Sequence, residues 1–176
     1  EVLEGRGVLP DVEVPSPAIN YVLQGLLENG VLFDFAVQQR GALDAPEDAA
    51  EFVLDEATWN TFVAYVSALE EVPYASQTLQ AFASLEATAK EELLDHVNEK
   101  ALITLKSGLQ ADVPVDLKTH QTEVRRALAQ ELVVHLYNTS GEYKHGLVHD
   151  PVALRAVALL ESGEFVSILT GPEAAN

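Results

Sequence analysis

Apolar residues recur at helical spacing through almost the whole of this chain. Between residues 16 and 170, Val, Leu, Ile and Phe return every three or four positions, and Gly or Pro separates one stretch from the next. This period predicts amphipathic helices rather than strands. The stretches are too short for a coiled coil, and many are too wide for its narrow seam. We therefore expect an all-α fold, a multi-helix orthogonal bundle of seven or eight helices with short links.

Capping signals place several of the expected helices. Ser16-Pro17 and Asp150-Pro151 each join a capping side chain to a Pro that suits the first turn. Asp55 should cap another helix, and Asp116 one that reaches about Tyr137. The apolar residues expected to face inward in the first three helices are Ile19, Val22, Leu23, Leu26 and Leu27, then Leu32, Phe33, Phe35, Ala36 and Val37, then Trp59, Phe62, Val63, Val66 and Leu69.

The remaining segments are assigned from the same pattern. A long helical stretch is expected over residues 75–109, bent or broken near Thr88 because its two apolar stripes are out of register. Residues 42–51 read as an acidic loop, and residues 138–146, with two glycines, as a turn. A last short helix should carry Phe165, Ile168 and Leu169, and residues 171–176 should form a frayed tail.

The first 15 residues differ from the rest. Val12 and Val14 alternate with Asp11 and Glu13, which predicts a short strand. A lone strand is not stable, so we expect an extended arm that is loose or pairs with a sheet supplied from elsewhere. The chain contains no Met and opens with Glu1. We therefore expect a piece of a longer protein, with a helical domain over residues 16–170.

The charge balance excludes several classes of function. The chain carries 28 acidic residues against 10 Lys and Arg, a formal charge of -18. Such a surface repels nucleic acid and anionic membranes. No apolar run approaches the ~20 residues of a membrane span. The lack of Cys excludes disulfides, thiolate metal sites and a Cys nucleophile.

The histidines in the second half are the first candidates for chemistry. Glu131 and His135 lie four residues apart and should share one helix face. Together with His145, His149 or Asp150 they would supply zinc ligands. The alternative, which we favour, is that these residues and His120 are surface or boundary side chains. No tight ligand spacing such as His-Glu-x-x-His supports the zinc hypothesis.

Other candidates favour structural interpretations. Ser140, near Lys144 and His145, invites a nucleophile hypothesis, but the segment reads more simply as a helix end and turn. Arg125-Arg126 should be tied to neighbouring acids. The acidic set of Glu47, Asp48, Glu51, Asp55 and Glu56 lacks the spacing of a calcium-binding EF-hand loop. The aromatic residues Phe33, Phe35, Trp59, Phe62 and Tyr65 are expected in the core rather than in a ligand pocket.

Several motifs resemble one protein family. Gly7-Val8-Leu9-Pro10-Asp11-Val12-Glu13-Val14 resembles the segment that closes the catalytic core of C-terminal processing (tail-specific) peptidases. Gly30-Val31-Leu32-Phe33-Asp34-Phe35-Ala36 is similar to a stretch in the C-terminal region of many bacterial members. Phe52-Val53-Leu54-Asp55, followed by Trp59, resembles the next helix, and residues 131–141 match in part. The motifs follow the family's order over about residues 5–170.

The resemblance implies a non-catalytic role for this chain. Family members are serine endopeptidases with a Ser/Lys dyad, and the dyad and a PDZ-like domain would lie upstream of residue 1. No position here matches the dyad, so we assign no catalytic, cofactor or metal residue. Residues 1–15 would be the trailing strand of the peptidase core. The helical domain would pack on that core, mediate assembly or shape substrate access.

The same resemblance implies partners and a location. The partners would be the upstream core, the protein substrates of the parent enzyme and possible further copies of the chain. The location would be periplasmic or extracellular. Three alternatives stay open: a stand-alone acidic helical module that binds a protein, a metal enzyme built on His135, and acidity that reflects only a salt-rich host.

Overall fold

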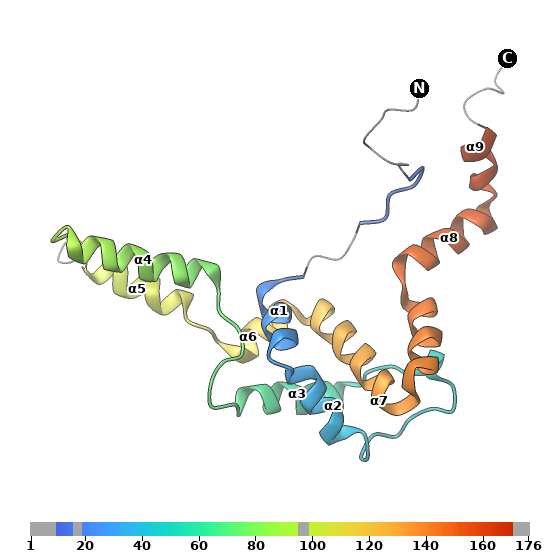
Figure 1. Ribbon diagram of the computed structural model, residues 1–176, viewed down its shortest axis with the longest axis horizontal. Helices are drawn as coiled ribbons and strands as arrows, with labels where there is room; N and C mark the ends of the chain where they lie inside the picture. Colours follow the sequence, from blue (N-terminus) through green and yellow to red (C-terminus); the bar gives the residue numbers. More distant parts are fainter. Residues whose placement is uncertain (1–9, 16–18, 95–98, 171–176) are drawn as a thin grey trace.

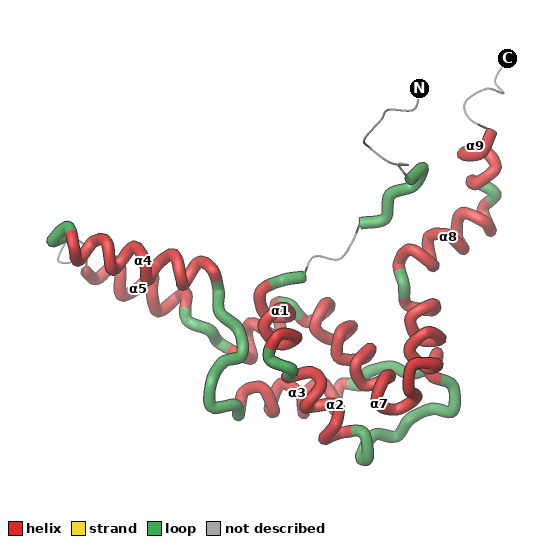
Figure 2. The backbone as a smooth tube through the Cα atoms, viewed as in Figure 1, coloured by secondary structure: helices red, strands yellow, loops and turns green. Residues whose placement is uncertain are grey.

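The computed structural model describes residues 10–15, 19–94 and 99–170, and all regular secondary structure in these ranges is helical (Figure 1, Figure 2). This confirms the all-α prediction, with nine α-helices in the described ranges instead of the seven or eight expected. The helices are α1 Tyr21–Glu28, α2 Val31–Gln39, α3 Glu56–Ser67, α4 Gln77–Glu91, α5 Glu99–Leu109, α6 Val113–Thr119, α7 Gln121–His149, α8 Pro151–Ser162 and α9 Glu164–Thr170, with a 3-10 helix, η1 Ala49–Glu51.

A compact body forms from α1, α2, α3, α6 and the first half of α7. The ring of Phe35 in α2 meets the ring of Phe62 in α3 edge-on, with centroids 5.1 Å apart. Burial of side chains of this size stabilises the fold by roughly 1.5–3 kcal/mol each. The fully buried side chains of the body are Val22, Leu26, Leu32, Phe35, Phe62, Val66, Leu117, Val124, Leu128, Leu132 and Val133.

Some residues expected in the core lie outside it. Phe33 is 53% exposed, and its ring packs edge-on against His135 at 5.0 Å. Ile19, Leu27 and Val37 are also exposed. The helices α1 and α2 are short and meet at Gly30, which has a positive φ of 67°. The turn at Gly30 orients only a narrow face of each helix toward the body. Part of the wider apolar face that the sequence predicted for each helix is therefore exposed.

The helix caps agree with the sequence in two cases. The Asp55 carboxylate accepts a hydrogen bond from the backbone N–H of Thr58 at 2.6 Å, and Asp150 accepts one from that of Val152 at 2.6 Å. The start of α1 differs, because its cap is Asn20, while Ser16 lies outside the described residues. These side chains satisfy N–H groups that have no partner within the helix.

The prediction that Asp116 caps a helix is wrong. The cap is Asp112, whose carboxylate accepts from the N–H of Val115, and Pro114 stands in the first turn of α6. The expected single helix is interrupted at His120, where α6 ends and α7 follows. Asp116 is inside α6 and turns its carboxylate toward two tyrosines, a use that no local spacing signals.

The expected long helix over residues 75–109 is a hairpin of α4 and α5. The break falls at residues 92–94, where Leu93 has a φ of 59°, and not at Thr88. The hairpin projects from the body (Figure 1) and is bridged by Lys106 and Glu86, 2.7 Å apart. Phe82 is the buried residue of α4, and α5 buries none of its described residues.

The predicted turn at residues 138–146 is also wrong. Only Asn138 leaves helical geometry, with φ 60° and ψ -170°, and the helix resumes after it. The kink brings Gly141 against Tyr137 and Ala49, so a Cβ at position 141 would collide with Tyr137 and press on Ala49 at 3.1 Å. The Tyr137 hydroxyl donates to the Pro46 carbonyl at 2.6 Å. Packing against η1 therefore overrides the local turn preference, and η1 itself replaces part of the expected acidic loop.

The described part of the N-terminal arm and the last two helices lie beyond the body (Figure 1). The described part of the arm, residues 10–15, bends at Asp11 and Val12 and has no strand. Helices α8 and α9 continue from the end of α7 and rise away from the body (Figure 1). Residues 1–9 and 171–176, with the expected start of the strand and the frayed tail, lie outside the described residues.

Candidate functional site

Asp116 is the centre of a polar cluster between α1, α6 and the loop before α4. One carboxylate oxygen accepts from the Tyr74 hydroxyl at 3.1 Å and from the backbone N–H of Asp112 at 3.1 Å. The other accepts from the Tyr21 hydroxyl at 3.4 Å. The rings of Tyr21 and Tyr74 meet edge-on at 5.8 Å, and the His120 ring lies 5.7 Å from Tyr21.

The cluster holds its tyrosines protonated. Burial, followed by the negative charge of Asp116, raises the pKa of Tyr74 well above its ordinary value and raises the pKa of Tyr21 in the same direction. A phenol with a raised pKa is a poor general base or nucleophile at neutral pH. The cluster therefore has a structural role. It joins α1 to both ends of the α4–α5 hairpin, since Tyr74 precedes α4 and Asp116 follows α5.

A second contact fastens the same loop to α1. The Asn29 side chain donates to the carbonyls of Gly25 at 3.0 Å and Pro73 at 2.9 Å. Gly25 has no room for a side chain, because an added Cβ would collide with Tyr74. Local spacing does not predict the contact between Asn29 and Pro73, since these residues lie 44 positions apart and an asparagine is common at a helix end.

An open groove of about 710 Å³ runs beside this cluster. Tyr21, Tyr65 and Tyr74 line it together with acidic side chains of α1, α2 and the loop after α3, namely Glu28, Asp34, Glu70 and Glu71. Negative charge on this scale repels anionic ligands. The groove lies in the more acidic half of the chain, residues 1–88, which holds 15 acids and 2 bases.

The histidines proposed as zinc ligands form separate pairs. His135 meets Glu131 at 3.2 Å on α7, as their spacing predicted. The His145 ring lies 4.3 Å from the His149 ring, beyond the kink at Asn138. Within the described ranges, no group of three or more His, Asp or Glu side chains is arranged to hold a metal ion. The structure therefore gives the zinc hypothesis no complete ligand set there.

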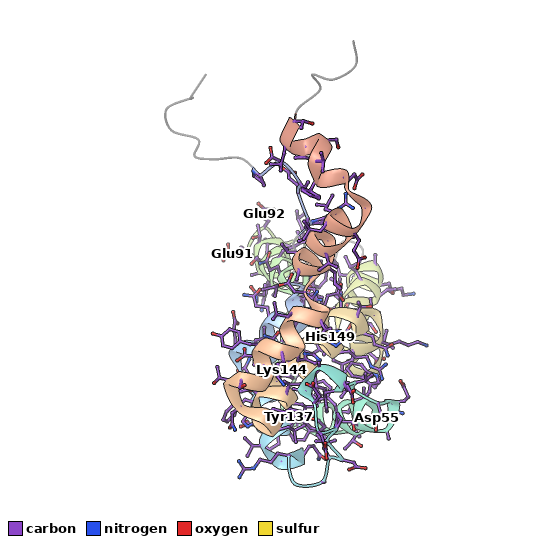
Figure 3. All side chains as sticks on the ribbon, turned by 90° about the vertical axis from the view of Figure 1, so that its right-hand side faces the viewer. Asp55, Glu91, Glu92, Tyr137, Lys144 and His149 are labelled. Carbon is purple, nitrogen blue, oxygen red and sulfur yellow. The ribbon has the colours of Figure 1, made fainter. Side chains whose placement is uncertain are left out.

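His145 is buried against the loop that follows η1. Its ring lies 6.3 Å from that of Phe52. Burial first, and then the neighbouring His149, lower the pKa of His145, while the Phe52 backbone opposes the shift. The ring is thus neutral at physiological pH. Figure 3 shows Tyr137, Lys144 and His149 following one another along this second half of α7.

The other candidate residues have structural partners. Asp48 caps η1, Asp55 caps α3 and Glu56 pairs with Arg125, so three members of the acidic set are engaged separately. Arg125 also lies over the Trp59 ring, 5.0 Å from its centroid. This confirms the expectation that Arg125 is tied to an acid.

Ser140 does not sit in an active-site-like setting. It is exposed on the helical segment just after the kink, and the turn expected around it is absent. Lys144, one turn on, approaches Asp48 at 3.8 Å. A nucleophilic serine needs a base in hydrogen-bond reach and donors for an oxyanion, and the Lys144 ammonium is directed to Asp48 instead.

Helices α8 and α9 present apolar side chains to solvent. Neither buries any residue. We call their exposed apolar residues, with one from the end of α7, the C-terminal apolar surface: Leu147, Val152, Leu154, Val157, Leu160, Val166 and Leu169, each at least half exposed. No described helix combines the length and apolar character that a bilayer crossing requires.

Comparison with known proteins identifies the family. A family model for the C-terminal helical domain of a probable PDZ-protease matches residues 22–160. The chain belongs to this family. This confirms the resemblance read from the sequence, a C-terminal helical domain of a protease. No curated protein and no solved structure matches the chain.

The family match covers the packed parts of this C-terminal helical domain. It takes in the body from Val22 onward, the hairpin and most of α8, and it leaves out the N-terminal arm, Tyr21 and helix α9. The aromatic residues Phe35, Trp59 and Phe62, on which two of the resembling motifs depend, are buried in its core. Those motifs are therefore signatures of packing in this domain.

Proposed function

We propose that this domain is the non-catalytic C-terminal part of a tail-specific serine endopeptidase. The observation that carries the proposal is the family match over residues 22–160, joined to the motif at Gly7–Val14 that resembles the end of a peptidase core. The Ser/Lys dyad and the PDZ-like domain would belong to the preceding part of the same chain. The protein substrates are those of the parent enzyme, and the location is periplasmic or extracellular.

The state of the candidate groups supports a non-catalytic role. Asp116 accepts hydrogen bonds from two tyrosines and a backbone N–H, and burial keeps His145 neutral beside Phe52. Ser140 lies exposed in a helix. None of these side chains is placed beside a partner that would activate it for hydrolysis.

The projecting hairpin supports a part in substrate access. Leu85, Ile103 and Leu105 are at least half exposed on α4 and α5, and the Asp116 cluster anchors both ends of the hairpin in the body. A projecting hairpin with exposed apolar side chains is suited to contact with an unfolded polypeptide. Replacing residues 77–109 by a short Gly/Ser link in the full-length enzyme should raise KM for protein substrates more than for a short peptide.

The decisive experiment compares two proteins in one assay. The 176-residue chain and the full-length protein that contains it are each incubated with an unstructured protein substrate. Cleavage by the full-length protein alone, lost on replacement of its upstream Ser or Lys, is the expected result. Turnover by the 176-residue chain that His145→Ala or Ser140→Ala abolishes would refute the proposal. Secretion of the full-length protein into the medium or periplasm tests the location.

A further inference from the structure

Helix α8 carries large apolar side chains over more than half of its circumference, although it buries none of its residues. At 3.6 residues per turn, Val152, Leu160, Val157 and Leu154 spread over about 200°, and each is more than half exposed, while Arg155 stands on the remaining side. An apolar face wider than the stripe of a surface helix is normally covered by other protein. Residues 151–170 contain only three charged residues, Arg155, Glu161 and Glu164, in a chain of net charge -18.

An apolar groove adjoins this surface. It has a volume of about 520 Å³ and lies where the end of α7 meets α8. Tyr143, Leu147, Val152, Ala153 and Ala156 line most of it, and Glu142 and Asp150 stand at its polar edge. A groove with apolar walls and few charges fits an apolar side chain of a protein partner, as at the centre of protein interfaces.

The N-terminal arm leads to the same place. Val12 and Val14 are half-buried, and together with Pro10 and Pro15 they line a depression that Val152 of α8 also borders. A second depression joins Val14 and Pro15 to His145 and His149 at the end of α7. The described part of the arm, residues 10–15, therefore lies alongside the start of α8, on the side away from the α4–α5 hairpin (Figure 1).

We propose that α8 and α9 are the surface on which the preceding protease core of the same chain docks. This inference rests on the proposed function, and it assigns the face by which the domain meets the core. The tether decides between the core and a second copy as occupant. A core joined through the arm is present at an effective concentration in the millimolar range. A second copy must instead bring up a body of net charge -18 from solution.

The test measures amide hydrogen exchange in the full-length protein and in the 176-residue chain alone. Residues 151–170 should exchange about tenfold or more slowly in the full-length protein, because docking adds burial to helices that bury nothing in the chain alone. Leu160→Glu in the full-length protein should restore the fast exchange. Ile103→Glu on the hairpin is the matched control, since Leu160 and Ile103 are each 61% exposed, and it should leave the exchange of residues 151–170 unchanged.

Three outcomes would overturn the inference. Equal exchange of residues 151–170 in both proteins means that the core does not cover α8 and α9. Equal effects of Leu160→Glu and Ile103→Glu mean that the surface is not specific. Protection that rises with protein concentration and accompanies a dimer in sedimentation means that a second copy is the occupant. These outcomes leave the proposed function intact if the full-length protein is a peptidase, whereas a full-length protein without peptidase activity refutes the proposed function itself.

Discussion

Helices α3 and α8 have the same length, twelve residues, and a similar share of apolar side chains, but they differ in burial. In α3, Thr58, Trp59, Phe62 and Val66 are buried, whereas α8 has no buried residue. The apolar side chains of α3 lie on one stripe, which α2, α6 and α7 cover. Those of α8 spread over about 200° of the helix, with Arg155 on the remaining side, and the body covers none of them.

Apolar residues therefore have different roles in the two regions. In the body they pack within the chain, where the ring of Phe62 contacts those of Phe35 and Trp59. At the C-terminal apolar surface they specify a contact that the described residues do not make. Water-exposed apolar surface of this extent is typical of an interface. The body should therefore be sensitive to core substitutions in the chain alone, and α8 only in the full-length protein.

The largest expected effect is the loss of Phe62. In the 176-residue chain, Phe62→Ala should lower the free energy of unfolding by about 3–5 kcal/mol, since it leaves a cavity beside Phe35 and Trp59. Leu160→Ala, the matched change in α8, should alter it by less than ~0.5 kcal/mol. Urea denaturation followed by circular dichroism measures both. Equal losses would remove the distinction between the two regions.

The second effect concerns the cluster that anchors the hairpin. Asp116→Ala should lower the free energy of unfolding by about 2–4 kcal/mol, because it leaves the hydroxyls of Tyr74 and Tyr21 without their acceptor. Tyr74→Phe should lower it by less, since this change removes only one hydrogen bond. In the double variant the losses should not add, because both changes break the same hydrogen bond. Additive losses in urea denaturation would show that Asp116 and Tyr74 do not act together.

The cluster also predicts a decline in stability at alkaline pH. The pKa values of Tyr74 and Tyr21 are raised above the 10.0 of an unfolded chain. Their contribution is complete below pH 10.0 and is lost as the pH rises above it, because the unfolded state then releases protons that the folded state keeps. Tyr74→Phe should therefore show a shallower fall of Tm with pH above 10.0 than the unsubstituted chain.

A smaller effect tests the kink in α7. Gly141→Ala should lower the free energy of unfolding by roughly 1–3 kcal/mol, since the added Cβ collides with Tyr137 and approaches Ala49 at 3.1 Å. Gly146→Ala is the matched control in the same helix, because nothing lies within 4 Å of a Cβ there. It should stabilise the chain by up to ~1 kcal/mol, the usual gain of Gly→Ala in a helix. Stabilisation by both substitutions would show that the kink leaves room at Gly141.

Local patterns in the sequence predicted the parts of the fold that depend on nearby residues. The caps at Asp55 and Asp150 and the buried stripes of Val22, Phe35 and Phe62 follow from spacing alone. The errors lie where distant contacts decide. Asp116 looked like a cap because its distant partners, Tyr21 and Tyr74, could not be inferred from its neighbours.

The same limit applies to α7 and to the C-terminal helices. Residues 138–146 carry the composition of a turn, and packing of Gly141 on Ala49 keeps them helical. Apolar spacing in α8 and α9 predicted helices correctly but also implied burial, which requires a partner outside the described residues. Periodicity thus indicates which face seeks cover without indicating what covers it.

The smallest effect comes from His145, at the junction of the two regions. Its pKa is lowered below the ordinary 6.5, so its contribution to stability is complete above that pH and is lost as the pH falls through the lowered value. Protonation of His145 would place a positive charge in its buried site, where its ring lies 4.3 Å from the His149 ring at the end of α7. Between about pH 7.5 and about pH 5.5, Tm should therefore fall more in the unsubstituted chain than in His145→Gln. The comparison uses the fall and not Tm itself, because His145→Gln also disturbs the contact with Phe52 at both pH values. An equal fall of Tm in the two proteins would mean that protonation of His145 does not destabilise the end of α7, from which α8 extends.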